Sequence, residues 1–204
     1  AAYQIFERVN ARGASLEIAD LLKNQLFANS KSELMDEWDS KVTQVPHIKQ
    51  MLKYFYVSRR GGIPARRLYK ELKNYADDLK EDDTDDSHYD KFLEELIEFS
   101  NFYKKIKEFR GSDDGKLEEL LEGTLNKQSP KYTTRLKHIH LSLAGIDVMN
   151  VTTTIPLFYS IIRAYKKLDK NHRSINEDFL PLLFRNFENF LFVNLYVCDK
   201  SGGT

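Results

Sequence analysis

The sequence predicts an all-α fold, an irregular multi-helix bundle of about eight to nine helices. Across most of the 204 residues, large apolar side chains recur at intervals of three and four, which places them on one face of an α-helix. A strand is conceivable only at the one β-branched run, Val151-Thr152-Thr153-Thr154. The hydrophobic fraction of 41% is ordinary for a protein with a buried core, so wholesale disorder is not expected.

Two helical patterns flank a polar corner near the start of the chain. Residues 5–9 place apolar side chains on one helical face, and residues 16–27 do so again. Between them, Gly13 can adopt the left-handed conformation that ends a helix. Asn10 and Arg12 are therefore expected at a sharp corner, beside helix amide groups that suit an anion such as phosphate. The alternative is a purely structural connector.

Five further helices are expected before residue 126, each from its own apolar stripe: 31–42, 48–57, 68–80, 89–109 and 117–125. The clearest pattern is 89–109, where acidic residues precede basic ones on the polar side, the order that the helix dipole favours. The single tryptophan, Trp38, is expected to face inward from the first of these helices.

Three more helices complete the predicted bundle: 132–149, one that begins near Pro156, and a last one that starts after Ser174 or Asn176. Thr133 or Thr134 is expected to cap the first, and a threonine before Pro156 is expected to cap the second. The last helix is apolar nearly all round. We therefore expect it to be central to the bundle or covered by another domain.

Length and composition predict a single helical domain over residues 1–200, with a linker tail at 201–204. The acidic run at residues 81–87 lacks the pattern of a calcium loop, so it is interpreted as a solvated linker and a possible sub-boundary. The sequence begins with Ala1 and not with an initiator Met, and it shows no signal peptide. We therefore expect a fragment of a larger protein. The single cysteine, Cys198, excludes an internal disulfide and fits a cytoplasmic location.

The charge balance argues against general DNA affinity. Lys plus Arg and Asp plus Glu both total 31, so the formal net charge is zero. Any nucleic-acid contact must then come from a local patch or from parts outside this chain. The most apolar stretch, residues 179–198, is interrupted by charged and amide side chains, which favours a buried helix over a membrane span. No membrane contact is expected.

Four arginines surround a Gly-Gly-Ile-Pro break and form a candidate phosphate or nucleic-acid site: Arg59, Arg60, Arg66 and Arg67. Guanidinium groups match phosphate oxygens bidentately, so two arginine pairs on a flexible loop would suit a phosphate. Direct DNA binding through them would depend steeply on salt. The alternative is a solvated loop, whose arginines pair with the acidic run at residues 81–86.

The sequence carries no recognisable catalytic or metal-binding motif. It has neither a nucleophile elbow nor a phosphate-cradling glycine loop. His138 and His140 are two residues apart, which on a helix turns them about 200° from each other, so they cannot share a metal there. No catalytic residue, no metal ligand and no cofactor is therefore predicted within this fragment.

One ordered string resembles a known family: Phe6, Asn10, Arg12, Gly13, Leu16, Asp20, Leu21, Lys23 and Asn24. It is similar to the F-x-x-x-N-x-R-G-x-x-L and D-L-x-K-N signature of the GmrSD-type restriction family, domain-of-unknown-function family 262. In that family the signature follows a ParB-like domain with an Asp-Gly-Gln-Gln-Arg motif, which these residues lack. The chain thus resembles only the rear helical part of such a protein.

The resemblance implies a nucleotide-dependent, modification-type DNA restriction or phage-defence protein, of which this fragment is not catalytic by itself. It implies an NTP and a divalent metal for the complete protein, with DNA, an upstream ParB-like domain and a downstream HNH-type nuclease domain as partners. By position, four residues would form the nucleotide pocket: Phe6, Asn10, Arg12 and Gly13. Three would support it: Asp20, Lys23 and Asn24.

A second hypothesis comes from the residues rather than from the resemblance. The chain would be an α-helical protein-interaction scaffold that docks a partner domain through its apolar C-terminal helix.

Overall fold

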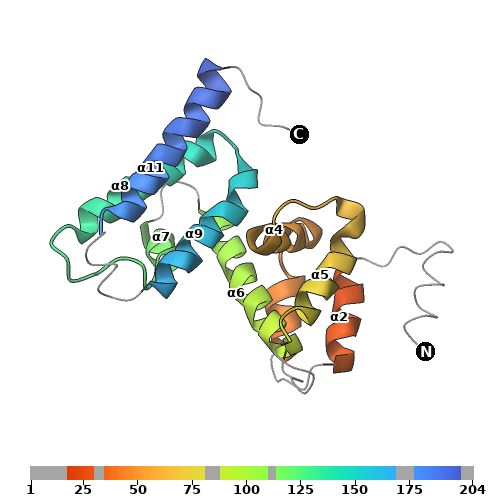
Figure 1. Cartoon of the computed structure of the whole chain (residues 1–204). Helices are drawn as coiled ribbons and strands as arrows, with labels where there is room; N and C mark the ends of the chain where they lie inside the picture. The colour runs from red at the N-terminus through yellow and green to blue at the C-terminus, as the bar shows by residue number, and fades with distance from the viewer. Residues whose placement is uncertain (1–17, 30–34, 81–87, 110–113, 169–176, 199–204) are drawn as a thin grey trace. The chain divides into compact units, whose positions relative to one another are not determined.

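All regular structure in the described part of the chain is helical (Figure 1). The computed structural model describes residues 18–29, 35–80, 88–109, 114–168 and 177–198. Within these ranges there are nine α-helices and four short 3-10 or π-helical segments, and there is no strand. The predicted all-α, multi-helix fold is confirmed.

The chain forms two compact units, Ala1–Asn101 and Phe102–Thr204. The acidic run at 81–87, predicted as a possible sub-boundary, lies outside the described residues. The division between the units instead falls within α6 (His88–Glu108), so this helix contributes residues to both of them.

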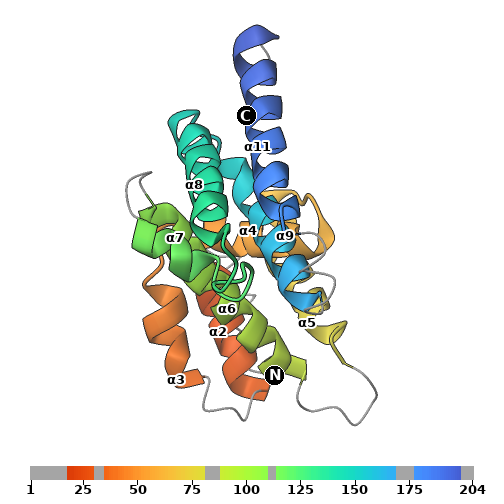
Figure 2. The ribbon, with the colours of Figure 1, turned by 90° about the vertical axis from the view of Figure 1, so that its left-hand side faces the viewer.

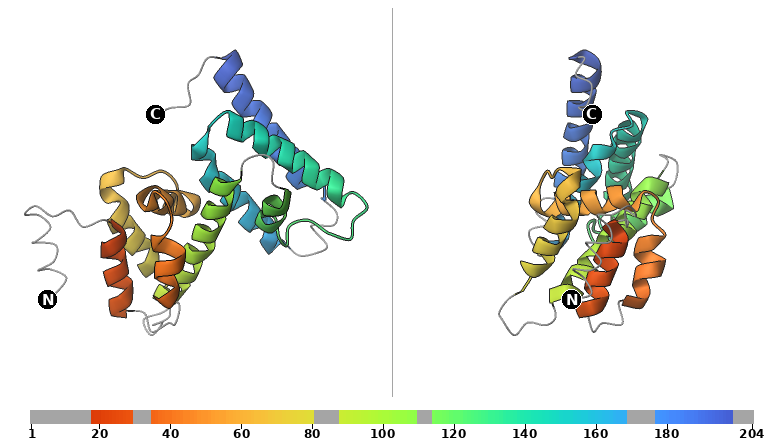
Figure 3. Two further views of the ribbon diagram at one scale, coloured as in Figure 1. Left: turned by 180° about the vertical axis from the view of Figure 1, so that it is seen from behind. Right: turned by 90° about the vertical axis from the view of Figure 1, so that its right-hand side faces the viewer.

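The first unit contains the elements α2 (Ile18–Asn29), α3 (Met35–Glu37), η1 (Trp38–Thr43), α4 (Ile48–Arg60), η2 (Ala65–Arg67) and α5 (Leu68–Asp77). Helices α2, α4 and α5 contact one another, and α2 and α5 lie side by side in Figures 1 and 3. Trp38 is completely buried, which confirms its predicted inward position.

Phe55 of α4 is the centre of this unit's core. Its ring packs edge-on against Tyr75 of α5 and against Phe92 and Phe99 of α6, with ring centroids 5.9, 5.6 and 5.7 Å away. Phe92 and Phe99 are seven residues apart, so they share one face of α6. Aromatic pairs in this geometry contribute attraction beyond simple burial.

The second unit contains the end of α6, α7 (Asp114–Leu120), α8 (Tyr132–Val148), η3 (Thr152–Thr154), α9 (Ile155–Lys167), α11 (Phe179–Phe192) and η4 (Val193–Val197). Helices α8 and α11 lie side by side in all views (Figures 1 and 2). The buried side chains of α8, α9 and α11 form the core between them.

The predicted threonine caps are wrong. The residue that precedes α8 is Lys131, and neither Thr133 nor Thr134 caps the helix, because both lie inside it. Before α9, the hydroxyl of Thr154 donates to the carbonyl oxygen of Val151 at 2.7 Å, so it does not cap the new helix. The β-branched run Val151 to Thr154 contains the helical turn η3 and not a strand, in agreement with the prediction of a helix start here. Pro156 lies in the first turn of α9.

We expect Phe55→Ala to lower the free energy of unfolding by about 3–5 kcal/mol, because it leaves a cavity among three aromatic rings. Phe27→Ala is the matched control. Phe27 is 51% exposed, and its loss should cost less than about 1 kcal/mol. Urea unfolding of both variants, followed by circular dichroism, measures the difference, and equal costs would contradict the central position of Phe55.

Candidate protein-docking face

The start of α11 is held against α8 by Arg135. Its guanidinium Nε donates to Asp178 Oδ1 at 2.7 Å, and Nη1 donates to Ser129 Oγ at 2.8 Å and also pairs with the carboxylate of Glu177. Arg135 is itself buried, with 7% of its surface exposed. Because Glu177 and Asp178 directly precede α11, this cluster fixes where the helix begins.

Both carboxyl groups have lowered pKa values. The Arg135 hydrogen bond is the largest cause of the lowered pKa of Asp178. For Glu177, burial favours a higher pKa, but the hydrogen bond from Ser129 and the charge of Arg135 together outweigh it and lower the pKa. Both groups are therefore held as carboxylates at neutral pH.

Farther along, α8 and α11 approach each other closely. A Cβ atom built at Gly145 would lie 2.3 Å from Oε1 of Glu188, so the glutamate side chain occupies the space beside the glycine. The first contact joins Arg135 to Asp178, and the second joins Gly145 to Glu188. Each partner in the second contact comes ten residues after its counterpart in the first. Because the contacts advance in the same direction along both helices, the helices run parallel.

The far end of α11 extends past α8. If the same residue offset is continued, Val148, the last residue of α8, corresponds to Leu191 of α11. The segment η4 therefore continues beyond the end of α8 (Figure 2). The predicted central position of the last helix is therefore wrong for the described residues. Cover from another domain, the other prediction, stays a prediction.

The inner side of α11 belongs to the core of the second unit. Leu180 and Phe184 are almost completely buried. The ring of Phe158, from α9, lies 5.1 Å from that of Phe184 and 5.6 Å from that of Phe187, between ring centroids. These contacts use one side of the helix. On the opposite side, the ring of Phe179 stacks on Tyr165 of α9 at 6.3 Å between centroids, and the remaining length is uncovered within the described residues.

That opposite side, here called the outer face, consists of Phe179, Leu182, Asn186, Phe190, Val193 and Val197. Their spacing of three and four residues keeps them within an arc of about 80° over the α-helical part. Five of the six are apolar, with exposed fractions of 50, 57, 59, 45 and 68% in chain order. Asn186, the polar member, is exposed as well.

The size of this face is that of the largest apolar patch on a typical monomer, which is often a functional surface. Five side chains that are about half exposed present on the order of 500 Å² of apolar surface, because a large side chain carries roughly 150–250 Å². Single exposed apolar residues are normal, but contiguous patches of roughly 300–600 Å² often bind a partner. Phe192 and Tyr196, exposed by 53 and 61%, extend the face along one flank.

The predicted nucleotide-site residues are only partly described. Phe6, Asn10, Arg12 and Gly13 lie outside the described residues. Of the three supporting residues, Asp20 and Asn24 are exposed on α2. Lys23 Nζ lies 2.5 Å from Asp39 Oδ1, a contact that lowers the pKa of Asp39, and 5.2 Å from the ring centroid of Phe27. Lys23 therefore braces α2 against η1.

The four arginines do not occupy one loop. Helix α4 continues through Arg60 and ends at Gly61, which has a φ of 96°, so Arg59 and Arg60 lie on the last helical turn. Arg66 and Arg67 belong to η2 instead, after the break. The prediction that all four share a flexible loop is therefore wrong.

Three of these arginines face carboxylates. The side chain of Arg59 is 6% exposed, and its Nε lies 3.3 Å from Glu95 Oε2. The corresponding distances are 3.1 Å from Arg60 Nη2 to Asp78 Oδ2 and 4.0 Å from Arg67 Nε to Glu71 Oε1. Arg66 is exposed and has no ion pair with any described residue. The three carboxylates do not belong to the acidic run that the alternative named, which lies outside the described residues, so both that pairing and phosphate binding stay predictions.

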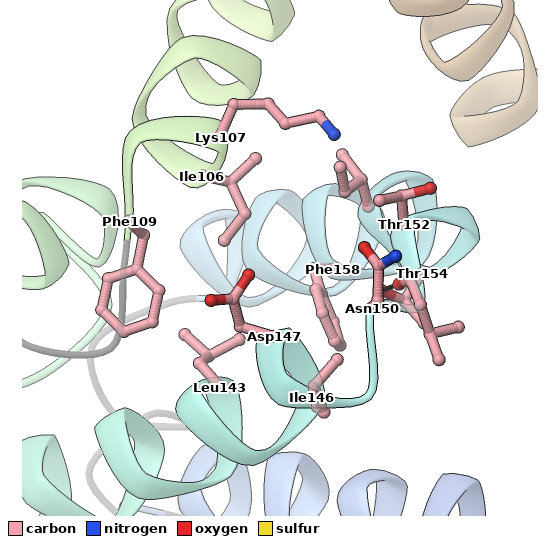
Figure 4. A pocket seen from close by; sticks show the side chains of 12 residues that line it. Ile106, Lys107, Phe109, Leu143, Ile146, Asp147, Asn150, Thr152, Thr154 and Phe158 are labelled. Carbon is pink, nitrogen blue, oxygen red and sulfur yellow. Dashed lines mark hydrogen bonds between the residues drawn. The ribbon is translucent and has the colours of Figure 1, made fainter. Parts of the chain in front are cut away.

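A small pocket of about 100 Å³ opens in the second unit between the ends of α6 and α8 and the turn η3 (Figure 4). Leu143, Ile146 and Phe158 provide apolar lining, while Lys107 and Asp147 contribute opposite charges. Ligand sites for drug-sized molecules measure roughly 300–1,000 Å³, so this pocket cannot enclose a nucleotide.

Within the described ranges, no group of three His, Cys, Asp or Glu side chains is arranged to hold a metal ion. No helix in those ranges is long and apolar enough to cross a membrane. Among these residues, the outer face of α11 and η4 is the most extensive feature that the fold leaves unused.

We expect Arg135→Gln to destabilise the second unit at neutral pH and to flatten its response to acid. Carboxyl groups whose pKa is lowered on folding stabilise the fold above their ordinary values of about 4, and this stability is lost as the pH falls through the lowered values. Urea unfolding over a pH series measures the slope. Lys137→Gln, an exposed change on the same helix, should keep the wild-type slope, and an unchanged slope in Arg135→Gln would contradict the cluster.

The chain matches no protein-family model, no curated protein and no solved structure. Its function must therefore follow from its own residues.

Proposed function

We propose that this chain is a helical, non-catalytic interaction module, which docks another folded protein through the outer face of α11 and η4. The observation that carries the proposal is the row of half-exposed apolar side chains on a helix whose other side is already buried. A helix that presents apolar residues at such intervals is a common recognition element, since it packs into a complementary apolar surface.

The contacts at the base of the helix support this role. Arg135 fixes the start of α11, and the rings of Phe158 and Phe184 hold its inner side. The outer face is therefore presented on a rigid helix rather than on a loop, so little ordering is needed on binding.

The larger process is proposed from the sequence. The string from Phe6 to Asn24 resembles the GmrSD-type signature, and we propose that the module works within a nucleotide-dependent DNA restriction or phage-defence protein. The catalytic groups, the NTP and the divalent metal would then be held by other parts of that protein, such as a ParB-like or an HNH-type nuclease domain. The neutral charge of the chain fits a role in which other parts contact DNA.

The docking role predicts position-specific crosslinking. A benzophenone amino acid at position 190, in cells that express the complete protein, should give one discrete product, because Phe190 would lie in the interface. Phe27 is a matched control, an aromatic residue exposed by 51% against 59% for Phe190, and the same label there should give none. Equal products at both positions, or none at position 190, would remove the docking function.

The proposed nucleotide dependence predicts that Asn10→Ala and Arg12→Ala each weaken nucleotide binding by the complete protein. The reason is that Asn10 would be a polar pocket residue and Arg12 a phosphate neighbour. Calorimetric titration with ATP and GTP measures the affinity, and Lys137→Ala, an exposed cation on α8 outside both candidate sites, serves as the control. Unchanged binding and turnover in both variants would exclude them from a nucleotide site.

A further inference from the structure

The outer face has the residue spacing of a two-helix seam. Side chains at intervals of three and four form the row by which one helix packs into the holes of another. From Phe179 to Val197 the row runs for about 27 Å, at 1.5 Å per residue. Apolar residues occupy both of its ends, and Asn186 lies between them.

The chemistry of this row suits contact with itself. None of its six side chains is ionisable, so two copies can meet without like charges opposed. In a contact about a twofold axis the same surface patch is used on both chains, so each row must be complementary to itself. An asparagine meets that condition, because its side-chain amide both donates and accepts hydrogen bonds.

Asn186 distinguishes between the two possible directions. If the helices run parallel in register, Asn186 faces Asn186 of the other copy, and the two amides can bond to each other. If they run antiparallel about the middle of the row, Asn186 faces Phe190, and the amide loses its partner on burial. A single polar residue in such a seam is a known device for fixing register and orientation.

We propose that the partner of the outer face is a second copy of this chain, packed parallel and in register through α11 and η4. This inference rests on the docking function proposed above. The outer face of each chain presents on the order of 500 Å² of apolar surface, so a dimer buries about 1,000 Å² in total. This area is at the lower limit for specific interfaces, so the dimer is weak and depends on concentration.

Sedimentation equilibrium over a range of concentrations tests the dimer. The wild-type chain should pass from one to two chain masses as its concentration rises. Leu182→Asp should weaken the association at least about tenfold, because it places an unpaired carboxylate in the seam. Leu141→Asp on α8 is the matched control, since Leu141 is 58% exposed and Leu182 57%, and it should not alter the dimer. Circular dichroism shows that both variants stay folded.

Charged variants at position 186 test the register. Asn186→Lys and Asn186→Glu should each be monomeric, because like charges would face each other, and an equimolar mixture should form a one-to-one dimer. An antiparallel seam does not predict this rescue, since position 186 would face Phe190. A mixture that stays monomeric overturns the parallel arrangement.

The single cysteine gives an independent measure of direction. Cys198 is exposed at the end of η4, so a spin label can be attached there without adding a cysteine. A parallel dimer brings the two labels to the same end, whereas an antiparallel one separates them by about 30 Å along the axis. The longer distance overturns the parallel arrangement.

The outcomes also separate this inference from the proposed function. A chain that is monomeric at every concentration overturns the second copy as the partner. If position 190 then still crosslinks specifically to another protein or domain, the docking function stands and only its partner changes. If both experiments are negative, the docking function fails as well.

Discussion

The arrangement of the second unit depends on the parallel contact between α8 and α11. Arg135 fixes one end of this contact through two carboxylates, and the close approach at Gly145 sets the distance farther along. Helix α8 covers its parallel neighbour only as far as its own end at Val148. The exposed end of α11 and η4 is thus a consequence of where α8 ends, not of a local defect in packing.

The same contact explains why the two sides of this helix contribute differently to stability. Residues on the inner side, such as Phe184, lie among the rings of the core, where a polar substitution would cost several kcal/mol. Residues on the outer face already contact water, so the monomer loses little when they become polar.

Much of the fold could be predicted from the sequence, because apolar periodicity reports helices directly. The expected segments 48–57, 89–109 and 132–149 correspond to α4, α6 and α8, with ends that differ by at most a few residues. Helix ends were harder to predict, because several hydroxyls were available for each cap. Thr154, for example, bonds backward to Val151 instead of forward to the new helix.

The candidate site could be predicted only in part, for a related reason. Periodicity shows that α11 has apolar residues on all sides, but it cannot show which side the rest of the unit covers. That choice depends on Phe158 and Arg135, which are distant in sequence. The arginines near residue 60 show the same limit, since Glu95 and Asp78, which pair with Arg59 and Arg60, come from other parts of the chain.

Helix α6 shows the limit of periodicity for counting cores. Its apolar stripe is continuous in the sequence, which favours one core and one domain. In the structure Phe99 packs against Phe55, whereas Phe102, three residues later, packs against Tyr159, with centroids 5.7 and 5.2 Å apart. One stripe therefore serves two cores, because a helix of 21 residues, about 32 Å long, exceeds what one small core needs to cover. A long amphipathic pattern thus predicts that the helix is buried along its length, but it does not predict how many separate hydrophobic cores the helix joins.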